Sequence, residues 1–407
     1  MSEDLVVSIP SGGCVDCSNC GLCGKKVKEN MSVVLDDGKN ISPAATDGTA
    51  EGSPIQEIPT VVAVDLGTTT VGMYLVNALT GEQLGVFVAL NPQELHGSDV
   101  ISRIASAEKG HKEELQKLII DLIERGVAKV ATKGKPEMIV ISGNTVMGYL
   151  LMGYDTSSLG VYPFKMEHTG KMETVIAGIK TVLLPGISAF VGGDALAGMY
   201  SLDFHKKEEV SLLVDLGTNA EMVLGNKDKI LATAAAAGPA FDQKVYGAQL
   251  ISGVATLLKE GKIDSTGCLE DAYFESGATV GRMLITRQEI RGLQVAKAAV
   301  AAGIGLLLDE YGISAGEVDK VYLAGGLGFY LDLDAALAIK LFPEEFRSKI
   351  EVVGNTSLAG AHRYATAYKS DEAVPEKELE ELIGKTEEMN LAELPGFQEK
   401  FLSSMNF

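Results

Sequence analysis

The sequence predicts a two-lobed α/β protein with duplicated βββαβα units, preceded by a short cysteine-rich segment. Two observations predict it. A buried β run that ends in Asp-Leu-Gly-Thr and leads into a second β run occurs twice, at residues 61–76 and 211–224. Four of the five cysteines lie together, between positions 14 and 23. The 46 glycines and the 46% hydrophobic content agree with a tightly turned α/β protein.

The cysteine-rich segment, residues 1–30, carries Cys14, Cys17, Cys20 and Cys23 in GGCVDCSNCGLC. Runs of C-x2-C bind iron–sulfur clusters, and thiolates this close together can converge on one inorganic centre. A structural zinc site is the alternative, although zinc sites usually separate two C-x2-C pairs by a small fold. We therefore expect an iron–sulfur cluster, with [4Fe–4S] favoured and [2Fe–2S] second.

Residues 31–59 are expected to form a flexible linker, because they are rich in Gly, Ser, Pro, Asp and Asn and show no sustained hydrophobic period. The cluster would then be mobile relative to the rest of the chain. Lobe I is assigned to residues 60–205 and lobe II to residues 206–370.

The two lobes repeat the same order of elements. In each lobe, the paired β runs are followed by a helix, a strand, a glycine-containing turn and a further helix. The expected helices and strands are His111–Val130, Met138–Ser142, Gln288–Tyr311 and Lys320–Ala324. We expect each lobe to be a sheet crossed by helices, with a cleft between the lobes.

The tail, residues 371–407, is predicted to contain a helix at Glu376–Ile383 with a solvated acidic face. Phe397, Phe401 and Phe407 are expected to dock back onto the body of the protein. The lone fifth cysteine, Cys268, is expected to be a buried small residue or an idle thiol.

Composition excludes several classes of function. The net charge of −20 argues against nucleic-acid binding, which needs a basic surface. The acidic N-terminus does not resemble a signal peptide. The longest apolar stretch, Val295–Leu308, is interrupted by Lys297 and is too short to span a membrane. Free cysteines indicate a reducing compartment, so we expect a cytoplasmic protein that does not bind membranes.

The tandem Asp-Leu-Gly-Thr hairpins and the later Ala-Gly-Gly turn resemble the ATPase superfamily of actin, Hsp70 and the sugar kinases. Tight glycine turns expose backbone N–H groups that can bind phosphate oxygens. Hydroxyl and amide groups around the turns would add donors. The expected phosphate-binding residues are Gly67, Thr68, Thr69, Thr70, Gly217, Thr218 and Asn219. Asp65 and Asp215, at the ends of their strands, would hold Mg2+ largely through water.

The same resemblance suggests further ATP-site residues. Gly325 and Gly326 would lie against the adenosine, and Lys297 would reach the ribose or adenine. Asp194 and Glu221 are candidates for orienting the attacking water, with a helix N-cap as the alternative for Asp194. The run from Ala234 to Pro239, AAAAGP, would supply backbone contacts beneath the nucleotide. The sequence contains no Walker A motif, so a P-loop nucleotide site is not supported.

A cysteine cluster ahead of this ATPase core resembles the reductive activators of corrinoid proteins. The segments DLGTTTVG, SGNTVM, VGGDALAG, DLGTNAEM, YLAGGLG and GNTSLAGAH carry the likeness, which covers about residues 60–407. The resemblance implies ATP-dependent transfer of one electron from the N-terminal iron–sulfur cluster to the Co(II) corrinoid of a partner protein in a methyltransferase system, which regenerates Co(I). A low-potential donor that the sequence does not identify would supply the activator with electrons. It also suggests a homodimer. The short cysteine loop departs from the family, whose members generally carry a full ferredoxin domain there.

Three alternatives remain open at this point. Activators of 2-hydroxyacyl-CoA dehydratases and benzoyl-CoA reductases share the ATPase core, but their cysteines lie inside it. A small-molecule kinase of the same fold would leave the cysteine run unexplained. A non-enzymatic, ATP-gated redox sensor would bind both nucleotide and cluster without reducing a corrinoid.

Overall fold

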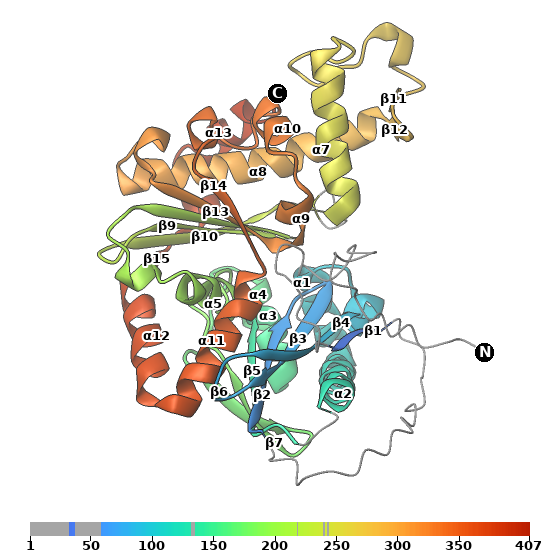
Figure 1. Cartoon of the computed structure of the whole chain (residues 1–407). Coiled ribbons are helices and arrows are strands. Elements are labelled where there is room, and N and C mark those ends of the chain that lie inside the picture. The colour runs from blue at the N-terminus through green and yellow to red at the C-terminus, as the bar shows by residue number, and fades with distance from the viewer. Residues whose placement is uncertain (1–31, 37–57, 132–134, 218, 239–240, 242–243) are drawn as a thin grey trace, which may run out of the picture. The chain divides into compact units, whose positions relative to one another are not determined.

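A computed structural model of the chain describes residues 32–36, 58–131, 135–217, 219–238, 241 and 244–407 (Figure 1). Its contacts divide the chain into two compact units. Unit 1 contains the described residues up to Pro185 together with Ser357–Lys377, and unit 2 contains Gly186–Thr356 and Glu378–Phe407. Each unit is therefore built from segments that are far apart in the sequence.

Unit 1 is built on a seven-stranded sheet in the order β1-β4-β3-β2-β5-β7-β6. Strands β2, β3 and β4 form an antiparallel meander, and β5 runs parallel to β2 on its other side. The strands are β1 (Ser32–Asp36), β2 (Thr60–Leu66), β3 (Thr70–Asn77), β4 (Gln83–Leu90), β5 (Met138–Gly143), β6 (Met172–Ile176) and β7 (Ile179–Leu183).

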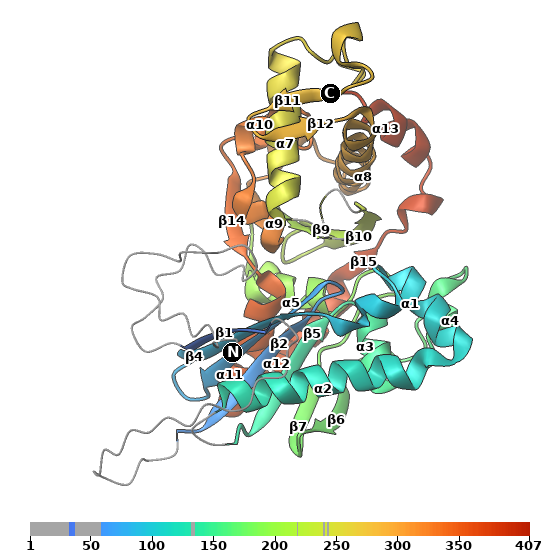
Figure 2. The ribbon, with the colours of Figure 1, turned by 90° about the vertical axis from the view of Figure 1, so that its right-hand side faces the viewer.

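Two helices cover opposite faces of this sheet. A Cβ at Gly126 of α2 (Lys112–Val130) would meet Met73 of β3, whereas a Cβ at the neighbouring Gly72 would meet Leu358 of α11 (Thr356–Ser370). Successive strand residues point to opposite faces, so α2 and α11 enclose the sheet between them (Figure 2). The other unit 1 helices are η1 (Pro92–His96), α1 (Val100–Ser106), α3 (Thr145–Met152) and α4 (Ser157–Gly160).

Unit 2 repeats this arrangement in a six-stranded sheet, in the order β14-β13-β8-β9-β10-β15. Strands β8, β9 and β10 form the antiparallel meander, and β13 runs parallel to β8. The strands are β8 (Ser211–Leu216), β9 (Asn219–Gly225), β10 (Ile230–Ala236), β13 (Lys320–Ala324), β14 (Ile350–Gly354) and β15 (Thr386–Glu388). The matching strand order confirms the duplication that the sequence predicts.

Helices again cover both faces of the sheet. A Cβ at Gly198 of α5 (Gly193–Ser201) would meet Leu213 of β8, whereas one at Gly303 of α8 (Arg287–Tyr311) would meet Met222 of β9. Leu213 and Met222 lie on opposite faces, because Met222 is paired with the residue after Leu213. The remaining elements are η3 (Phe204–Lys206), α7 (Lys244–Lys259), η4 (Asp271–Tyr273), β11 (Ala278–Val280), β12 (Met283–Ile285), η5 (Ala315–Glu317), α9 (Gly325–Tyr330), α10 (Leu333–Ala338) and η6 (Glu344–Phe346).

Helix α8 begins with a capping box between Thr286 and Glu289 and ends at Gly312, which adopts the left-handed conformation. It is the one helix in the described part of the chain that is long and apolar enough to cross a membrane. Its most apolar stretch is 72% buried inside the protein, as expected for a core helix.

The C-terminal segment packs on unit 2. Beyond α12 (Ala373–Lys385), it forms η7 (Leu391–Glu393) and α13 (Phe397–Ser403), and α13 packs against α8. Phe397 and Phe401 are partly buried against the hydrophobic core, and Phe407 belongs to it. The docking predicted for these three aromatic residues is therefore confirmed.

The structure differs from the sequence predictions at the linker. Residues 32–36 form β1, an edge strand that pairs in parallel with β4. The run Ser-Val-Val-Leu-Asp is too short to show a period, and it joins the sheet through backbone pairing that the sequence pattern does not reveal. By contacts, the compact units divide the chain after Pro185 and after Thr356.

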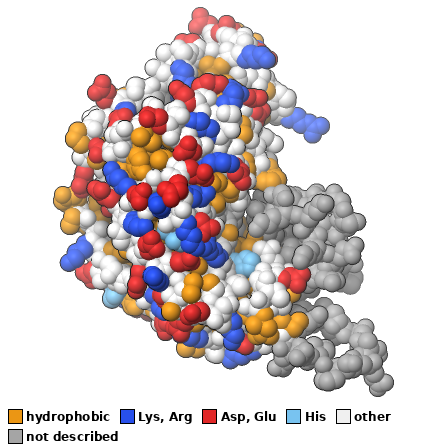
Figure 3. Space-filling view, turned by 60° about the vertical axis from the view of Figure 1, so that its left-hand side comes forward, with side chains coloured by type: hydrophobic (Ala, Val, Ile, Leu, Met, Phe, Trp, Pro, Cys, Tyr) orange, Lys and Arg blue, Asp and Glu red, His pale blue; other side chains and the backbone are white. Residues whose placement is uncertain are grey.

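The surface mixes charges of both signs. Figure 3 shows acidic and basic side chains interspersed over one face, with hydrophobic groups between them. Lys320 and Glu351, 3.2 Å apart, form one such pair within unit 2. Exposed pairs of this kind contribute little to stability, about 0–1 kcal/mol each.

Candidate functional site

The first predicted phosphate turn, Gly67-Thr68-Thr69 (turn 1), joins β2 to β3. Leu66 pairs with Val71, so the chain reverses within a few residues. A Cβ at Gly67 would lie 2.5 Å from the carbonyl oxygen of Thr70, and glycine is therefore required by this close approach. Thr69 is exposed, whereas Thr68 is 7% exposed and faces the protein interior.

Three side chains from other elements hold turn 1 in place. Asn91 donates through Nδ2 to the carbonyl oxygen of Gly67 at 2.9 Å. Arg103 donates through Nη2 to the carbonyl oxygen of Thr68 at 2.7 Å. Asn144, the N-cap of α3, donates through Nδ2 to the hydroxyl of Thr68 at 3.0 Å. Each bond satisfies a polar group of the turn.

Arg103 is fully buried, and its burial lowers the pKa of the guanidinium to about 10, against the opposing influence of Asp99 and Glu94. Further bonds reach the carbonyl oxygen of Gly97 at 3.0 Å and Oε1 of Gln93 at 3.2 Å. Sequence reasoning missed this residue, since an arginine on a short helix normally indicates an exposed face.

Asp65, the predicted Mg2+ ligand at the end of β2, is half-buried. The hydroxyl of Ser357, in the first turn of α11, donates to Asp65 Oδ1 at 2.7 Å. Ser142 of β5 lies beside Asp65 in the sheet, with its Oγ 2.8 Å from Ser357 Oγ. The two serines orient one oxygen of the carboxylate. Sequence reasoning also missed them, although the quoted segments SGNTVM and GNTSLAGAH contain them.

The second predicted turn, Gly217 to Asn219 (turn 2), joins β8 to β9. The N–H of Gly217 donates to the carbonyl oxygen of Asn219 at 2.9 Å and closes the turn. Asp215 is paired directly with Glu221 across the two strands, so both carboxylates lie on the same face of the sheet. Thr218 lies outside the described residues.

Gly325 lies against turn 2. A Cβ built on it would be 2.5 Å from Asp215 Oδ1 and 2.5 Å from the carbonyl oxygen of Leu216, and its φ is +84°. Both the space and the backbone conformation require glycine here. The structure thus brings the predicted Ala-Gly-Gly turn, including Gly326 in α9, next to the second Asp-Leu-Gly-Thr hairpin.

Asp194 lies in the first turn of α5, as predicted for a residue that opens a helix. The alternative, that it is the N-cap, is wrong. The N-cap is Gly192, and Asp194 Oδ1 accepts a hydrogen bond from the N–H of Ala195. Helix α5 packs on the sheet face from which Leu213 projects. Asp215, two residues further on, and its partner Glu221 project from the same face, so Asp194 lies in the helix that covers their face of the sheet.

The predicted AAAAGP segment, residues 234–239, begins in β10, and β10 pairs with β9, the strand that leaves turn 2. Ala235 and Ala236, at the end of β10, pair with Ala220 and Asn219. Small side chains keep this backbone close to the turn. Pro239 lies outside the described residues.

Lys297 has a different partner from the one predicted. Its side chain is fully buried, and its Nζ donates to the carbonyl oxygen of Asn406 at 2.7 Å and lies 5.5 Å from the ring centre of Phe407. Burial, together with the nearby charge of Lys340, lowers the pKa of Lys297 to about 8. The ammonium group thus binds the chain's own C-terminal segment, and it is not on a solvated helix face.

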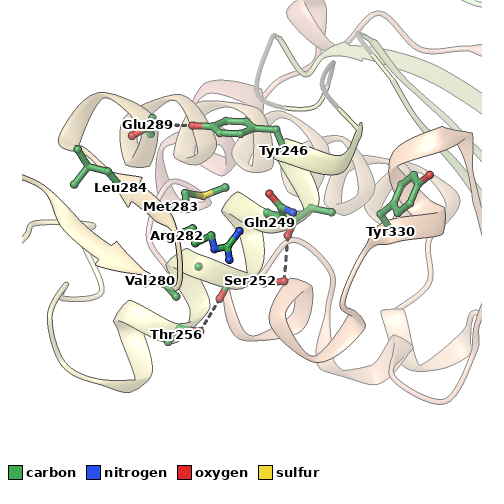
Figure 4. Close-up of a pocket in the computed structure, with 12 residues that line it drawn as sticks. Tyr246, Gln249, Ser252, Thr256, Val280, Arg282, Met283, Leu284, Glu289 and Tyr330 are labelled. Atoms are coloured by element: carbon green, nitrogen blue, oxygen red, sulfur yellow. Dashed lines mark hydrogen bonds between the residues drawn. The ribbon is translucent and has the colours of Figure 1, made fainter. Parts of the chain in front are cut away.

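A cavity of about 820 Å³ lies in unit 2 between α7, the β11–β12 hairpin and the start of α8 (Figure 4). The side chain of Arg282 points into it from the hairpin, and Tyr330, from the α9 helix that begins at Gly325, lines its far side. Tyr246 donates to Glu289, which raises the pKa of Tyr246 to about 12. The volume suits a small organic ligand.

The four predicted cluster ligands, Cys14, Cys17, Cys20 and Cys23, lie outside the described residues. Cys268, expected to be buried or an idle thiol, is exposed in a loop of unit 2. Its N–H donates to Asp264 Oδ1, in a turn that holds the side chain at the surface.

Two models of one protein family match the chain consecutively. The RACo middle region matches residues 60–207, and the C-terminal domain of RACo, the ASKHA domain, matches residues 209–253 and 244–407. The chain belongs to the RACo family. Its two-unit α/β architecture is the ASKHA fold of acetate and sugar kinases, Hsp70 and actin.

Similar proteins carry related names. The corrinoid activation enzyme RamQ of Eubacterium limosum is 28% identical over 384 residues, which cover 74% of this chain and 63% of RamQ. The [Co(II) methylated amine-specific corrinoid protein] reductase of Methanosarcina barkeri is 26% identical over 373 residues, covering 73% of this chain and 68% of the reductase. The chain therefore spans less than two thirds of RamQ's length.

Among solved structures, a reductive activator for a corrinoid, iron-sulfur protein superposes with a TM-score of 0.76 at 26% identity. The superposition covers 88% of this chain and 67% of that protein. The described fold is therefore that of a known corrinoid-protein activator.

Proposed function

We propose that this protein is an ATP-dependent reductive activator that returns a Co(II) corrinoid protein to Co(I). The observation that carries the proposal is the family match across residues 60–407, combined with two glycine turns whose surroundings suit phosphate binding. In the net reaction, one electron leaves the reduced activator and is accepted by Co(II), while ATP is hydrolysed. The source that reduces the activator is a low-potential donor.

Each of the two turns is proposed to bind phosphate oxygens of ATP. Backbone N–H groups of turn 1 and turn 2 would bind phosphate oxygens, with Thr69 as the exposed hydroxyl donor of turn 1. Each aspartate is of a type that fits Mg2+, because Asp65 in unit 1 and Asp215 in unit 2 are half-buried carboxylates at strand ends beside glycine turns. Mg2+, when bound, would neutralise charge on the phosphates.

Carboxylates on the face of the unit 2 sheet that α5 covers are proposed to orient a water molecule. Glu221 is paired with Asp215 across the strands, and Asp194 lies in the layer that both face. A carboxylate there can accept a proton from a water molecule and fix its orientation. We propose that Asp194 or Glu221 orients the water that attacks ATP.

The adenosine is proposed to occupy the cavity beside α7. Gly325 and Gly326 open α9, and Tyr330, six residues into the same helix, lines the cavity. An aromatic ring and the Arg282 guanidinium suit a purine, which stacks on planar groups. Lys297 is not included in this proposal, because it binds the C-terminal segment.

Cys14, Cys17, Cys20 and Cys23 are proposed to bind an iron–sulfur cluster, [4Fe–4S] in preference to [2Fe–2S]. The cluster, when bound, would supply the electron for Co(II). Conversion of all four cysteines to serine tests this role, with Cys268→Ser as the matched control at the exposed thiol.

The assay contains the protein, MgATP, a Co(II) corrinoid protein from the same organism, and a reductant too weak to form Co(I) unaided. The quadruple variant is expected to hydrolyse ATP but to form no Co(I), measured from its visible absorption band, while Cys268→Ser forms it normally. Normal Co(I) formation by the quadruple variant would contradict the relay. ATP hydrolysis with no Co(I) formation by either protein would instead favour a redox sensor.

A further inference from the structure

Two histidines and a glutamate lie close together in unit 1. The possible ligand atoms of His96, His111 and Glu114 all lie within 4.8 Å of one another. Glu114 Oε2 is 3.6 Å from His96 Nε2 and 3.3 Å from His111 Nδ1. The sequence alone shows no metal-binding spacing here, because His96 belongs to η1, whereas His111 is the N-cap of α2 and Glu114 lies in its first turn.

A kink in the helix brings the three groups together. Between α1 and α2, residues 107–111 form a kinked junction in which Gly110 has a non-helical φ of 97°. This conformation favours glycine. The kink places the ring of His111 5.1 Å from that of His96, centre to centre.

Two of the three separations between the ligand atoms match those of a metal centre. Zinc bonds nitrogen and oxygen at about 2.0–2.2 Å, so the ligand atoms of a tetrahedral site lie roughly 3.3–3.6 Å apart. The two distances from Glu114, 3.3 and 3.6 Å, fall in this range. Two imidazoles and one carboxylate form a three-ligand set that leaves a fourth position for water.

The environment of His96 adds a second argument. Its Nδ1 lies 3.2 Å from Ser106 Oγ, and its side chain is 12% exposed. A hydroxyl that accepts from Nδ1–H leaves the lone pair of Nε2 free to point at the other two ligands. Metal-binding histidines typically have their second nitrogen fixed in this way. An ordinary i,i+3 surface pair would involve His111 and Glu114 alone.

We propose that His96, His111 and Glu114 bind a divalent transition metal of the zinc class, which ties η1 to the start of α2. The clamp would stabilise the segment that holds turn 1. Gln93, in the same η1 helix, accepts a hydrogen bond from Arg103, and Arg103 donates to Thr68. The proposed site uses none of the four N-terminal cysteines and does not depend on the proposed function.

Isothermal titration of the full-length, cluster-loaded protein with Zn2+ tests the proposal. The wild type is compared with His96→Ala, His111→Gln and Glu114→Gln, and with Glu113→Gln, an exposed neighbour on α2, as the matched control. The cysteines contribute the same background to every titration, so only differences are interpreted. We expect the first three variants to bind one equivalent less, or to bind it at least tenfold more weakly, while Glu113→Gln binds like the wild type.

Thermal unfolding supplies the second measurement. Zn2+ is expected to raise the midpoint of the wild type and of Glu113→Gln, and to have a smaller effect on the three ligand variants. Unfolding without metal checks that each variant folds. Since His111 and Glu114 are exposed, their variants keep the test valid if His96→Ala does not fold. Equal zinc binding by His111→Gln, Glu114→Gln and the wild type would overturn the proposal.

Discussion

Turn 1 and turn 2 follow the same Asp-Leu-Gly-Thr sequence, yet they are stabilised in different ways. Turn 1 is held from outside, by Asn91, Arg103 and Asn144 on other elements. Turn 2 is one residue shorter between its flanking strand pairs, and a backbone hydrogen bond from Gly217 closes it. The duplicated motif thus conserves the position of the turn and not the interactions that stabilise it.

The aspartates that precede the two turns, Asp65 and Asp215, also have different neighbours. Asp65 is paired across the strands with Gly72 and receives a hydrogen bond from Ser357. Asp215 is paired with Glu221 and has Gly325 packed against it. The Asp65 carboxylate is therefore oriented by a hydroxyl group. The Asp215 carboxylate instead packs against the backbone of Gly325 and has a second carboxylate, that of Glu221, beside it. Substitutions in the two units are expected to act through these different neighbours.

The largest effect is expected from removal of either proposed Mg2+ ligand. Asp65→Ala and Asp215→Ala are each expected to lower the kcat of ATP hydrolysis by about 10²–10³-fold, since the phosphate charge loses its counterion site. Steady-state phosphate release measures this, with the visible spectrum of the cluster unchanged. Asp228→Ala, at an exposed position in unit 2, is the control. Wild-type hydrolysis by Asp65→Ala would remove turn 1 from the ATP site.

Gly325→Ala tests whether turn 2 depends on close backbone packing. We expect a loss of at least tenfold in ATP affinity, because the added Cβ would displace Asp215. Gly312→Ala is a matched control, since Gly312 has the same φ of +84° but no atom within 4 Å of an added Cβ. Both variants carry the backbone cost, about 1 kcal/mol, in chemical denaturation. Only Gly325→Ala is expected to weaken nucleotide binding in titration calorimetry, and equal effects would show that strain alone is responsible.

Ser357→Ala tests the hydroxyl that orients Asp65. Loss of a hydrogen bond to a charged group, about 1.5–3 kcal/mol, is expected to reduce ATP hydrolysis roughly tenfold or more. Ser357→Thr, which keeps the hydroxyl, is expected to recover part of the activity. If Ser357→Ala hydrolyses ATP at the wild-type rate, the carboxylate does not need this partner. The different surroundings of Asp65 and Asp215 would then have no effect on the rate of ATP hydrolysis.

Arg103 in unit 1 and Lys297 in unit 2 are both buried cations. The smallest effect is expected on the pH dependence of stability when Lys297 is replaced. The pKa of Lys297 falls from 10.5 to about 8 on burial, so between these pH values the unfolded chain binds more protons than the folded one. Folding stability from this group is therefore expected to rise with pH through that window, by about 1–3 kcal/mol. Lys297→Met is expected to lose the rise in urea denaturation between pH 7.5 and 10.5. The control Lys259→Met, at an exposed position, is expected to retain it, and an unchanged slope in Lys297→Met would contradict the burial effect.

Much of the fold follows from local patterns. The repeated hairpins, the strand Lys320–Ala324 and the long helix that ends at Tyr311 are found where the periodicity predicts them. These elements bury regular faces, and their spacing is therefore visible in the sequence. Strand β1 could not be predicted in the same way, because a five-residue edge strand depends on the partner it finds.

The parts of the site that escaped prediction rest on long-range packing. The contacts of Arg103 with turn 1 and of Lys297 with Asn406 require knowledge of which helix faces which strand. The glycines and aspartates of the turns are different, since their backbone geometry demands those residue types locally. The histidine and glutamate cluster needs a helix kink that spacing alone does not predict.

The hydrogen bond from Ser357 to Asp65 joins residues 292 positions apart and also constrains when the protein can mature. At translation rates of about 5–20 residues per second, Asp65 would leave the ribosome roughly 15–60 s before Ser357 does. During that interval the nascent sheet has β2 and its turn but lacks α11. Unit 1 can therefore be completed only after α11 has been synthesised, and a truncated chain that ends before α11 would expose the sheet face that α11 covers to chaperones and proteases.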